Sequence, residues 1–167
     1  NEVRAQGQAA ELLTSAMRTF QSLREQLGDK TPASLLFQLG RVYRLSGEYK
    51  QAIDLFEEIL KGSPTMLDAQ IEAAKAYEQW AGAVDAKYAA RAYETALNGA
   101  RPGANGKNII WGWGRISQMV SGRPEFREQF FEARYRVALC RFLMGKASQN
   151  ERVMQQAVND ITQVAAL

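Results

Sequence analysis

The sequence of 167 residues contains no histidine and a single cysteine, Cys140. Without histidine the chain lacks the commonest general base and the commonest metal ligand, so a nucleophilic Cys140 would have no imidazole beside it. One cysteine cannot form an internal disulfide. We therefore expect no enzyme, no cofactor and no metal site. Cys140 stands in an apolar stretch, and we expect it to be a small core residue.

Signals for strands and membrane spans are also scarce. The chain has only four prolines, no apolar run of bilayer length and no alternating run of β-branched residues. Its long segments free of Pro and Gly are rich in Ala, Leu, Gln, Glu and Arg, which favour helices. The sequence therefore predicts an all-α fold with about eight helices.

The positions of the helices follow from apolar residues at 3.6-residue spacing and from the Gly and Pro residues between them. We expect Thr31 to cap the second helix with Pro32 at its first position, and Gly82 to break the fourth. The predicted helices cover residues 1–27, 35–45, 49–60, 66–80, 84–97, 108–120, 125–144 and 151–166.

The formal net charge is +3, and it is unevenly distributed. Residues 107–152 contain nine basic and four acidic residues, a local surplus of five. Such a surplus favours an acidic partner, or it belongs to an exposed helical surface on which arginine stems cover apolar area. Nucleic acid is a weaker alternative, because acidic residues interrupt the basic stretch.

A repeat stands out at residues 33–66, a unit of 34 residues. Small residues, Gly40 and Ala52, let two antiparallel helices approach closely, and large apolar residues fill the remaining space. The segment resembles a tetratricopeptide repeat, with the departure that the large Ile59 occupies a position that is usually small. The residues that carry the resemblance are Leu36, Leu39, Gly40, Tyr43, Gly47, Tyr49, Ala52, Phe56 and Pro64.

A second, weaker unit covers residues 67–101, where Ala73, Ala74 and Tyr77 match the first helix and Ala89, Tyr93 and Ala96 match the second. Beyond it two alignments compete. Either Trp113-Gly114 or Tyr135 and Ala138 mark the next first helix. We expect a single tetratricopeptide-like domain over 1–167, with an N-terminal helix (1–28), repeats at 33–66 and 67–101, an irregular third pair (107–145) and a closing helix (151–167).

The resemblance implies a right-handed α-solenoid, in which the first helix of each pair lines a concave groove that holds a peptide or a helix. Arginine and aromatic residues are common anchors of protein interfaces. An N-terminal helix that folds into the groove is the alternative. The groove positions of the family fall here on a basic and aromatic set, Phe37, Arg41, Arg44, Lys75, Glu78, Trp111 and Arg115.

The sequence element Trp111-Gly112-Trp113-Gly114 is unusual, because glycine within a helix costs about 1 kcal/mol relative to alanine. We expect close helix packing to compensate, with the indoles filling gaps, rather than a ligand to stack there.

Together these features predict a non-catalytic protein–protein interaction scaffold, or adaptor, that presents a basic and aromatic groove to a partner. A nucleic-acid-binding repeat and a structural or self-associating module are the alternatives. Because the sequence begins at Asn1 rather than Met, we expect a piece of a longer protein. Both a cytoplasmic and an exported location fit it.

Overall fold

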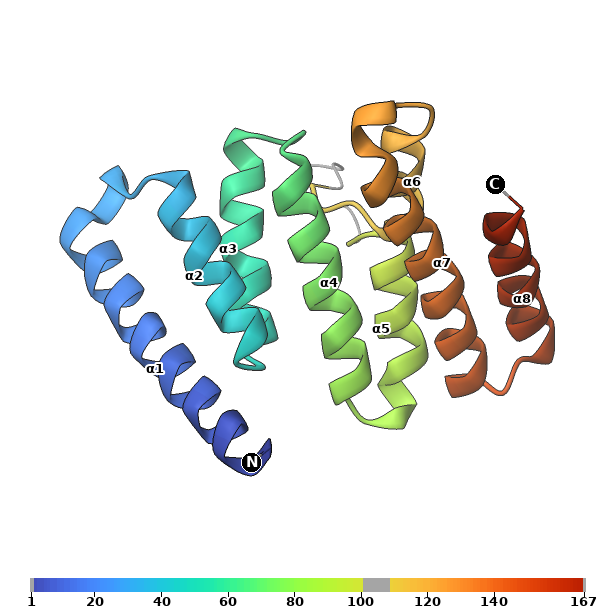
Figure 1. The fold of residues 1–167 in the computed structure, drawn as a ribbon, viewed down its shortest axis with the longest axis horizontal. Coiled ribbons are helices and arrows are strands. Elements are labelled where there is room, and N and C mark those ends of the chain that lie inside the picture. The colour runs from blue at the N-terminus through green and yellow to red at the C-terminus, as the bar shows by residue number, and fades with distance from the viewer. Residues whose placement is uncertain (1, 101–108, 167) are drawn as a thin grey trace.

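The computed structural model describes residues 2–100 and 109–166, which form eight α-helices and two short 3-10 helices (Figure 1). This part of the chain has no β-strand, only an isolated antiparallel bridge between Gly99 and Trp111. The elements are α1 (Glu2–Leu27), η1 (Gly28–Lys30), α2 (Ala33–Leu45), α3 (Tyr49–Gly62), α4 (Leu67–Ala83), α5 (Ala86–Asn98), α6 (Trp113–Val120), η2 (Pro124–Phe126), α7 (Arg127–Ala147) and α8 (Glu151–Ala165).

Consecutive helices stand side by side in a row that runs from α1 to α8 (Figure 1). Helices α2 and α3 form one antiparallel hairpin and α4 and α5 form the next, and α4 packs against α3. Helix α7 packs against α5, α6 and α8. The predicted fold class, an all-α stack of helix pairs like that of tetratricopeptide repeats, is confirmed.

Small residues set the distance between α2 and α3. A Cβ atom built on Gly40 would lie 2.8 Å from Cε1 of Phe56, closer than real Cβ atoms come to a neighbour. Ala52 and Phe56 are both fully buried, so the aromatic ring fills the space that the missing side chain leaves. The sequence had indicated this arrangement.

Two predicted helix boundaries are wrong. The hydroxyl of Thr31 donates to the carbonyl of Gly28 at the start of η1, with an Oγ1–O distance of 2.6 Å, and makes no cap for α2. Gly82 does not break the fourth helix, because α4 runs through it to Ala83. An exposed glycine costs a helix only about 1 kcal/mol, which the packing of α4 outweighs.

The segment around Trp113 differs more from the prediction. We expected a helix over 108–120, but α6 begins only at Trp113, and residues 109–112 precede it outside any helix. Gly112 is extended, with φ −89° and ψ 173°. At the far end of α7, Gly145 lies within the helix, where we had expected a loop to begin.

Helix α7 relates to its neighbours as α4 does to its own. α4 pairs with α5 and packs on α3, the second helix of the preceding pair; α7 pairs with α8 and packs on α5. This arrangement favours the alignment that begins the third unit at Tyr135 and Ala138, with α6 as an additional helix packed on α7.

Candidate functional site

Three of the predicted groove residues come together on the face formed by α2, α4 and α7. Arg44 of α2 is 9% exposed, and its Nε donates to Oε2 of Glu72 on α4 over 2.8 Å. Its Nη1 donates to Oε1 of Gln79 over 3.0 Å. Nζ of Lys75 lies 3.1 Å from Oε1 of Glu132 on α7. Ion pairs and hydrogen bonds therefore join all three helices across this face.

Glu78 is the centre of these contacts. Its Oε1 accepts from Nη1 of Arg136 on α7 over 2.6 Å, and its Oε2 accepts from the indole Nε1 of Trp113 over 2.9 Å. The thiol of Cys140 also donates to Oε2, over 3.7 Å. Glu78 is 9% exposed, and burial of a carboxylate is tolerated because cationic and neutral donors surround it.

These side chains enclose a small pocket. Its volume is about 190 Å³, and its lining consists of polar and charged residues: Arg44, Lys75, Glu78, Gln79 and Arg136. We call the face formed by these five residues, with Glu72 and Glu132, the charged face. A pocket of this size and polarity suits one side chain that bears hydrogen-bond acceptors.

The charged face is formally neutral, because it contains three cations and three carboxylates. Arg44, Lys75 and Arg136 each contact a carboxylate, and those carboxylates belong to Glu72, Glu78 and Glu132. The basic groove expected from the sequence is thus largely neutralised from within. Side-chain pairing of this kind fixes the helices relative to one another but leaves little net field for a partner.

Arg41 and Phe37 lie on the same side of α2 as Arg44, because they precede it by three and seven residues. The guanidinium carbon of Arg41 lies 6.0 Å from the centre of the Phe37 ring, and the Phe37 ring meets Phe56 edge-on. Arg41 is exposed, and its one side-chain hydrogen bond within the described chain is to Gln38. Arg41 is therefore a cation on this side of α2 that is available to an acidic group of a partner.

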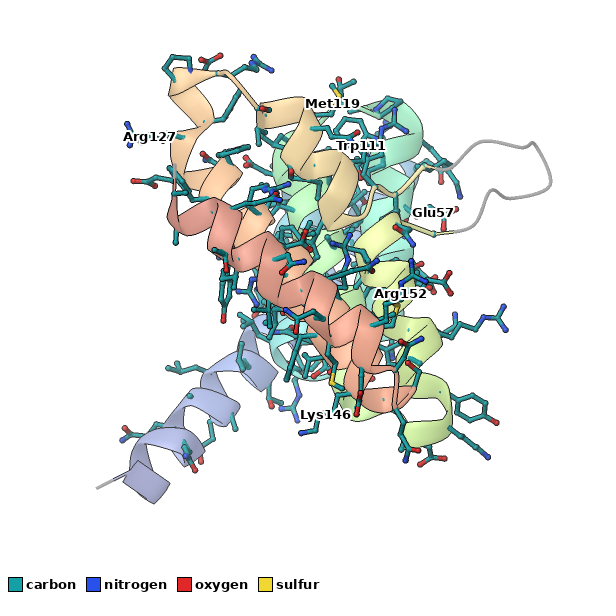
Figure 2. The ribbon with its side chains drawn as sticks, turned by 90° about the vertical axis from the view of Figure 1, so that its right-hand side faces the viewer. Glu57, Trp111, Met119, Arg127, Lys146 and Arg152 are labelled. Carbon is teal, nitrogen blue, oxygen red and sulfur yellow. The ribbon has the colours of Figure 1, made fainter. Side chains whose placement is uncertain are left out.

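Trp111 and Arg115 occupy a different place from the one the alignment gave them. Trp111 precedes α6 and is 5% exposed, and its backbone N–H donates to Oε1 of the buried Gln70 over 2.7 Å. Arg115 is exposed and lies over the Trp111 ring, 4.7 Å from its centre. Figure 2 shows Trp111 beside α6, near Met119. The indole of Trp111 therefore fills the core, as the packing hypothesis for this element expected.

Sequence reasoning missed Glu72, Glu132 and Arg136 as members of the charged face. Glu132 and Arg136 form an ion pair along α7, with 3.7 Å between Nη2 of Arg136 and Oε1 of Glu132. The i to i+4 spacing was visible, but it does not show which helix the pair faces. The alternative alignment of the third unit, with α7 as its first helix, would have pointed to Arg136, which then falls on the groove position that Phe37 has in the first repeat.

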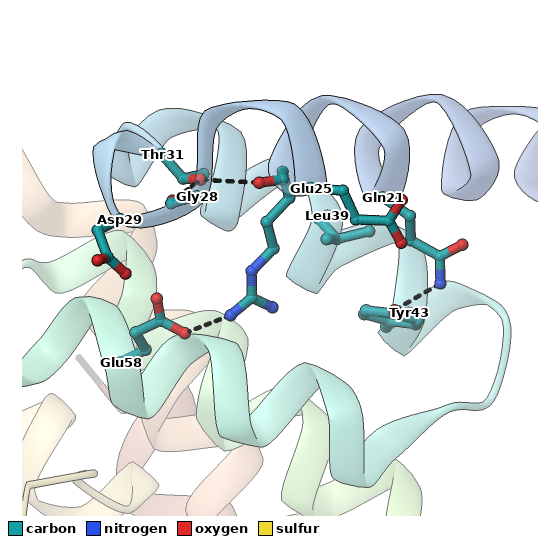
Figure 3. Close-up of a pocket in the computed structure, with 9 residues that line it drawn as sticks. Gln21, Glu25, Gly28, Asp29, Thr31, Leu39, Tyr43 and Glu58 are labelled. Carbon is teal, nitrogen blue, oxygen red and sulfur yellow. Dashed lines mark hydrogen bonds and ion pairs between the residues drawn. The ribbon is translucent and has the colours of Figure 1, made fainter.

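Helix α1 lies at the end of the row against α2 and reaches α3 through an ion pair between Arg24 and Glu58, 2.9 Å apart. Between α1 and these helices is an open polar crevice of about 700 Å³, whose lining includes Arg24, Glu25 and Tyr43 (Figure 3). Gln21 donates to the Tyr43 hydroxyl over 2.7 Å. The charged face is lined from α2, α4 and α7, so α1 does not occupy it.

The described residues offer no cluster of histidine, cysteine or carboxylate groups that would hold a metal ion. None of their helices is both long enough and apolar enough to traverse a bilayer. Cys140 is fully buried, as predicted. Burial raises the pKa of its thiol well above the ordinary range, and the neighbouring Glu78 carboxylate raises it further.

We expect Cys140 to be unreactive in the folded protein. Because the thiol is buried and held neutral, an aromatic disulfide reagent at mildly alkaline pH should modify it only after urea is added. Folding favours the neutral thiol, so the thiol's contribution to stability is complete below the ordinary thiol pKa and falls as the pH rises beyond it. Rapid modification of the native chain would contradict this.

Stacked antiparallel helix pairs whose first helices share a polar face define an α-helical repeat scaffold. Residues 3–64 match the family model described as "Tetratricopeptide repeat". This part of the chain, which includes α1, α2 and α3, is thus of tetratricopeptide type, and the resemblance seen in the sequence is confirmed. No curated protein and no solved structure gives a significant match. Repeats of this family generally mediate protein–protein interaction and are generally non-catalytic.

Proposed function

We propose that this chain is a non-catalytic scaffold that binds a peptide or a helix of a partner protein on the side formed by α2, α4 and α7. The observation that carries the proposal is the charged face itself. Arg44 of α2 and two residues of α4, Lys75 and Glu78, were selected from the sequence as groove positions, and they line one pocket.

The geometry supports recognition without turnover. The polar groups are held by one another at distances of 2.6 to 3.1 Å, so they form a rigid and preorganised surface. The pocket takes one acceptor-bearing side chain of the partner, and Arg41 with Phe37 offers an adjacent cationic and aromatic contact on α2. An acidic residue of the partner would pair with Arg41, since Arg44, Lys75 and Arg136 already contact carboxylates.

The same pairing weakens the nucleic-acid alternative. Within the basic stretch, Arg123, Arg136 and Arg141 contact Glu125, Glu78 and Asp160. Phosphate binding needs unpaired cations that release counterions.

A peptide display screen tests the proposal with the chain alone. We expect the enriched peptides to carry an acidic residue and to bind more weakly to the Arg41→Glu variant, by about tenfold or more, because a charge-assisted hydrogen bond contributes roughly 1.5–3 kcal/mol. Fluorescence polarisation of labelled peptides measures the affinity.

Arg91→Glu is the matched control, because Arg91 is also exposed but lies on α5. Binding to this variant should equal that of the unmodified chain. Both variants change the net charge equally, so a loss shared by the two would reflect nonspecific attraction and would refute the proposed site. The same conclusion follows if no peptide is enriched.

A further inference from the structure

The outer side of the α7–α8 pair carries an apolar groove with no covering element in the described chain. It has a volume of about 170 Å³, and no charged residue lines it. We call it the α7–α8 groove. Large parts of its aromatic and aliphatic side chains are exposed, 49% of Tyr135 and 46% of Val158. Its lining residues are Tyr135, Ala138, Leu139, Phe142, Ala157, Val158 and Ile161.

The corresponding sides of the earlier pairs are covered by a helix. α4 packs on α3 and contacts α2, and α7 packs on α5. The groove lies on the opposite side of α7 from Val137 and Cys140, which belong to the core shared with α5. The end of a helical stack is ordinarily polar when it faces water. By continuity with these interfaces, the groove is shaped for one more helix.

Helix α1, at the other end of the row, has an exposed apolar surface that suits this groove. Leu13, Met17 and Phe20 of α1 are partly buried, and Met17 and Phe20 pack on the core around α2 and α3. A second apolar stripe remains in solvent, with Leu12 71%, Leu23 38% and Leu27 41% exposed. On the side of this stripe that faces away from Met17 and Phe20, the flanking residues of α1 are uncharged: Ser15, Thr19, Ser22 and Gln26.

The two surfaces match in chemistry. At roughly 1.5 Å per residue, the stripe from Leu12 to Leu27 extends over about 22 Å, and the groove lining on α7, from Tyr135 to Phe142, over about 10 Å, so part of the stripe is long enough to fill the groove. Neither requires burial of a charge, which would oppose association. They lie at opposite ends of the row (Figure 1), and Figure 2 views the molecule from the α8 end. Within one copy, α1 therefore cannot reach the α7–α8 groove.

We propose that the α7–α8 groove binds helix α1 of a second copy of this chain, so that copies associate head to tail. This contact joins two different surfaces, and each added copy leaves both kinds of end free for further growth. The inference concerns the ends of the row and does not depend on the partner-binding role of the charged face.

Sedimentation and light scattering over a wide concentration range test it. We expect the weight-average mass of the unmodified chain to rise with concentration beyond that of two copies. Leu12→Glu and Val158→Glu each place a charge in one of the surfaces, and each variant alone should remain a monomer. Leu45→Glu is the control, because Leu45 is 54% exposed on α2, outside both surfaces.

The mixture of the two variants is the decisive measurement. Leu12→Glu keeps an intact groove and Val158→Glu keeps an intact α1, so together they should form a dimer that grows no further. Far-UV circular dichroism establishes that each variant is folded. A monomer at every concentration overturns the proposal, and so does association of either variant with itself. A mixture that stays monomeric overturns it as well.

Discussion

Replacing Gly112 with alanine should lower the free energy of unfolding by at least about 3 kcal/mol, the upper end of the usual cost of overpacking. An added Cβ would lie 2.3 Å from both the carbonyl oxygen of Leu97 and the backbone nitrogen of Gly99. Backbone atoms at the end of α5 cannot turn aside as a side chain can. The conformation of Gly112, φ −89° and ψ 173°, is open to any residue, so the penalty is steric.

Urea denaturation followed by tryptophan fluorescence measures this effect, because Trp111 and Trp113 flank the substituted residue. For a chain of this length the melting temperature should fall by roughly 10 °C. Gly7→Ala is the matched control, since a Cβ at Gly7 within α1 meets nothing within 4 Å. That change should be neutral or should stabilise the chain by up to about 1 kcal/mol through helix propensity. Equal effects of the two substitutions would refute the close approach at Gly112.

The same glycine shows where the sequence was informative. The Trp111-Gly112-Trp113-Gly114 element predicted close packing, and the structure places Gly112 against the backbone of α5 and Trp113 at 1% exposed. Likewise, the spacing of Gly40 and Ala52 predicted the narrow α2–α3 hairpin. Small residues next to aromatic ones are a local signal, and the sequence records them directly.

Contacts between distant segments left no such signal. Gln70 is fully buried and donates to the carbonyls of Pro64 and Ile109 while it accepts from the N–H of Trp111. These bonds hold residues 109–112 outside a helix and against α4, which explains why α6 begins late. A glutamine in a helical pattern reads as a surface residue, and only the fold shows which backbone groups it satisfies.

The charged face illustrates both cases. The family's groove spacing selected Arg44, Lys75 and Glu78. These residues lie in the first helices of two repeats, where the family's spacing continues without interruption. It misplaced Trp111 because residues 109–112 lie outside any helix and α6 is an additional helix before the third pair, and it missed Arg136 for the same reason. Helical periodicity assigns a residue to a face of its own helix, but it does not fix how that helix is rotated against its neighbours.

Removal of the Glu78 side chain should also cost roughly 3 kcal/mol, the lower end of the range for breaking a buried ion pair. Glu78→Ala takes away the acceptor of the Trp113 indole and the closest carboxylate of Arg136 at once. Arg136 is 31% exposed and keeps Glu132 at 3.7 Å, which places the cost at the lower end. Glu57→Ala is the control. Its ion pair with Lys61 is solvent-exposed, so its loss should cost about 0.5 kcal/mol or less.

A double-mutant cycle separates the contribution of the Glu78–Arg136 ion pair to stability from that of the hydrogen bond between Glu78 and Trp113. If Glu78 stabilises the fold mainly by compensating Arg136, then Glu78→Ala should be much less damaging in an Arg136→Met background, because no uncompensated cation remains. If the hydrogen bond to Trp113 dominates, the two effects should simply add. Because Glu78 joins α4 to both α6 and α7, additive effects would also argue against the rigid charged face from which partner binding is proposed.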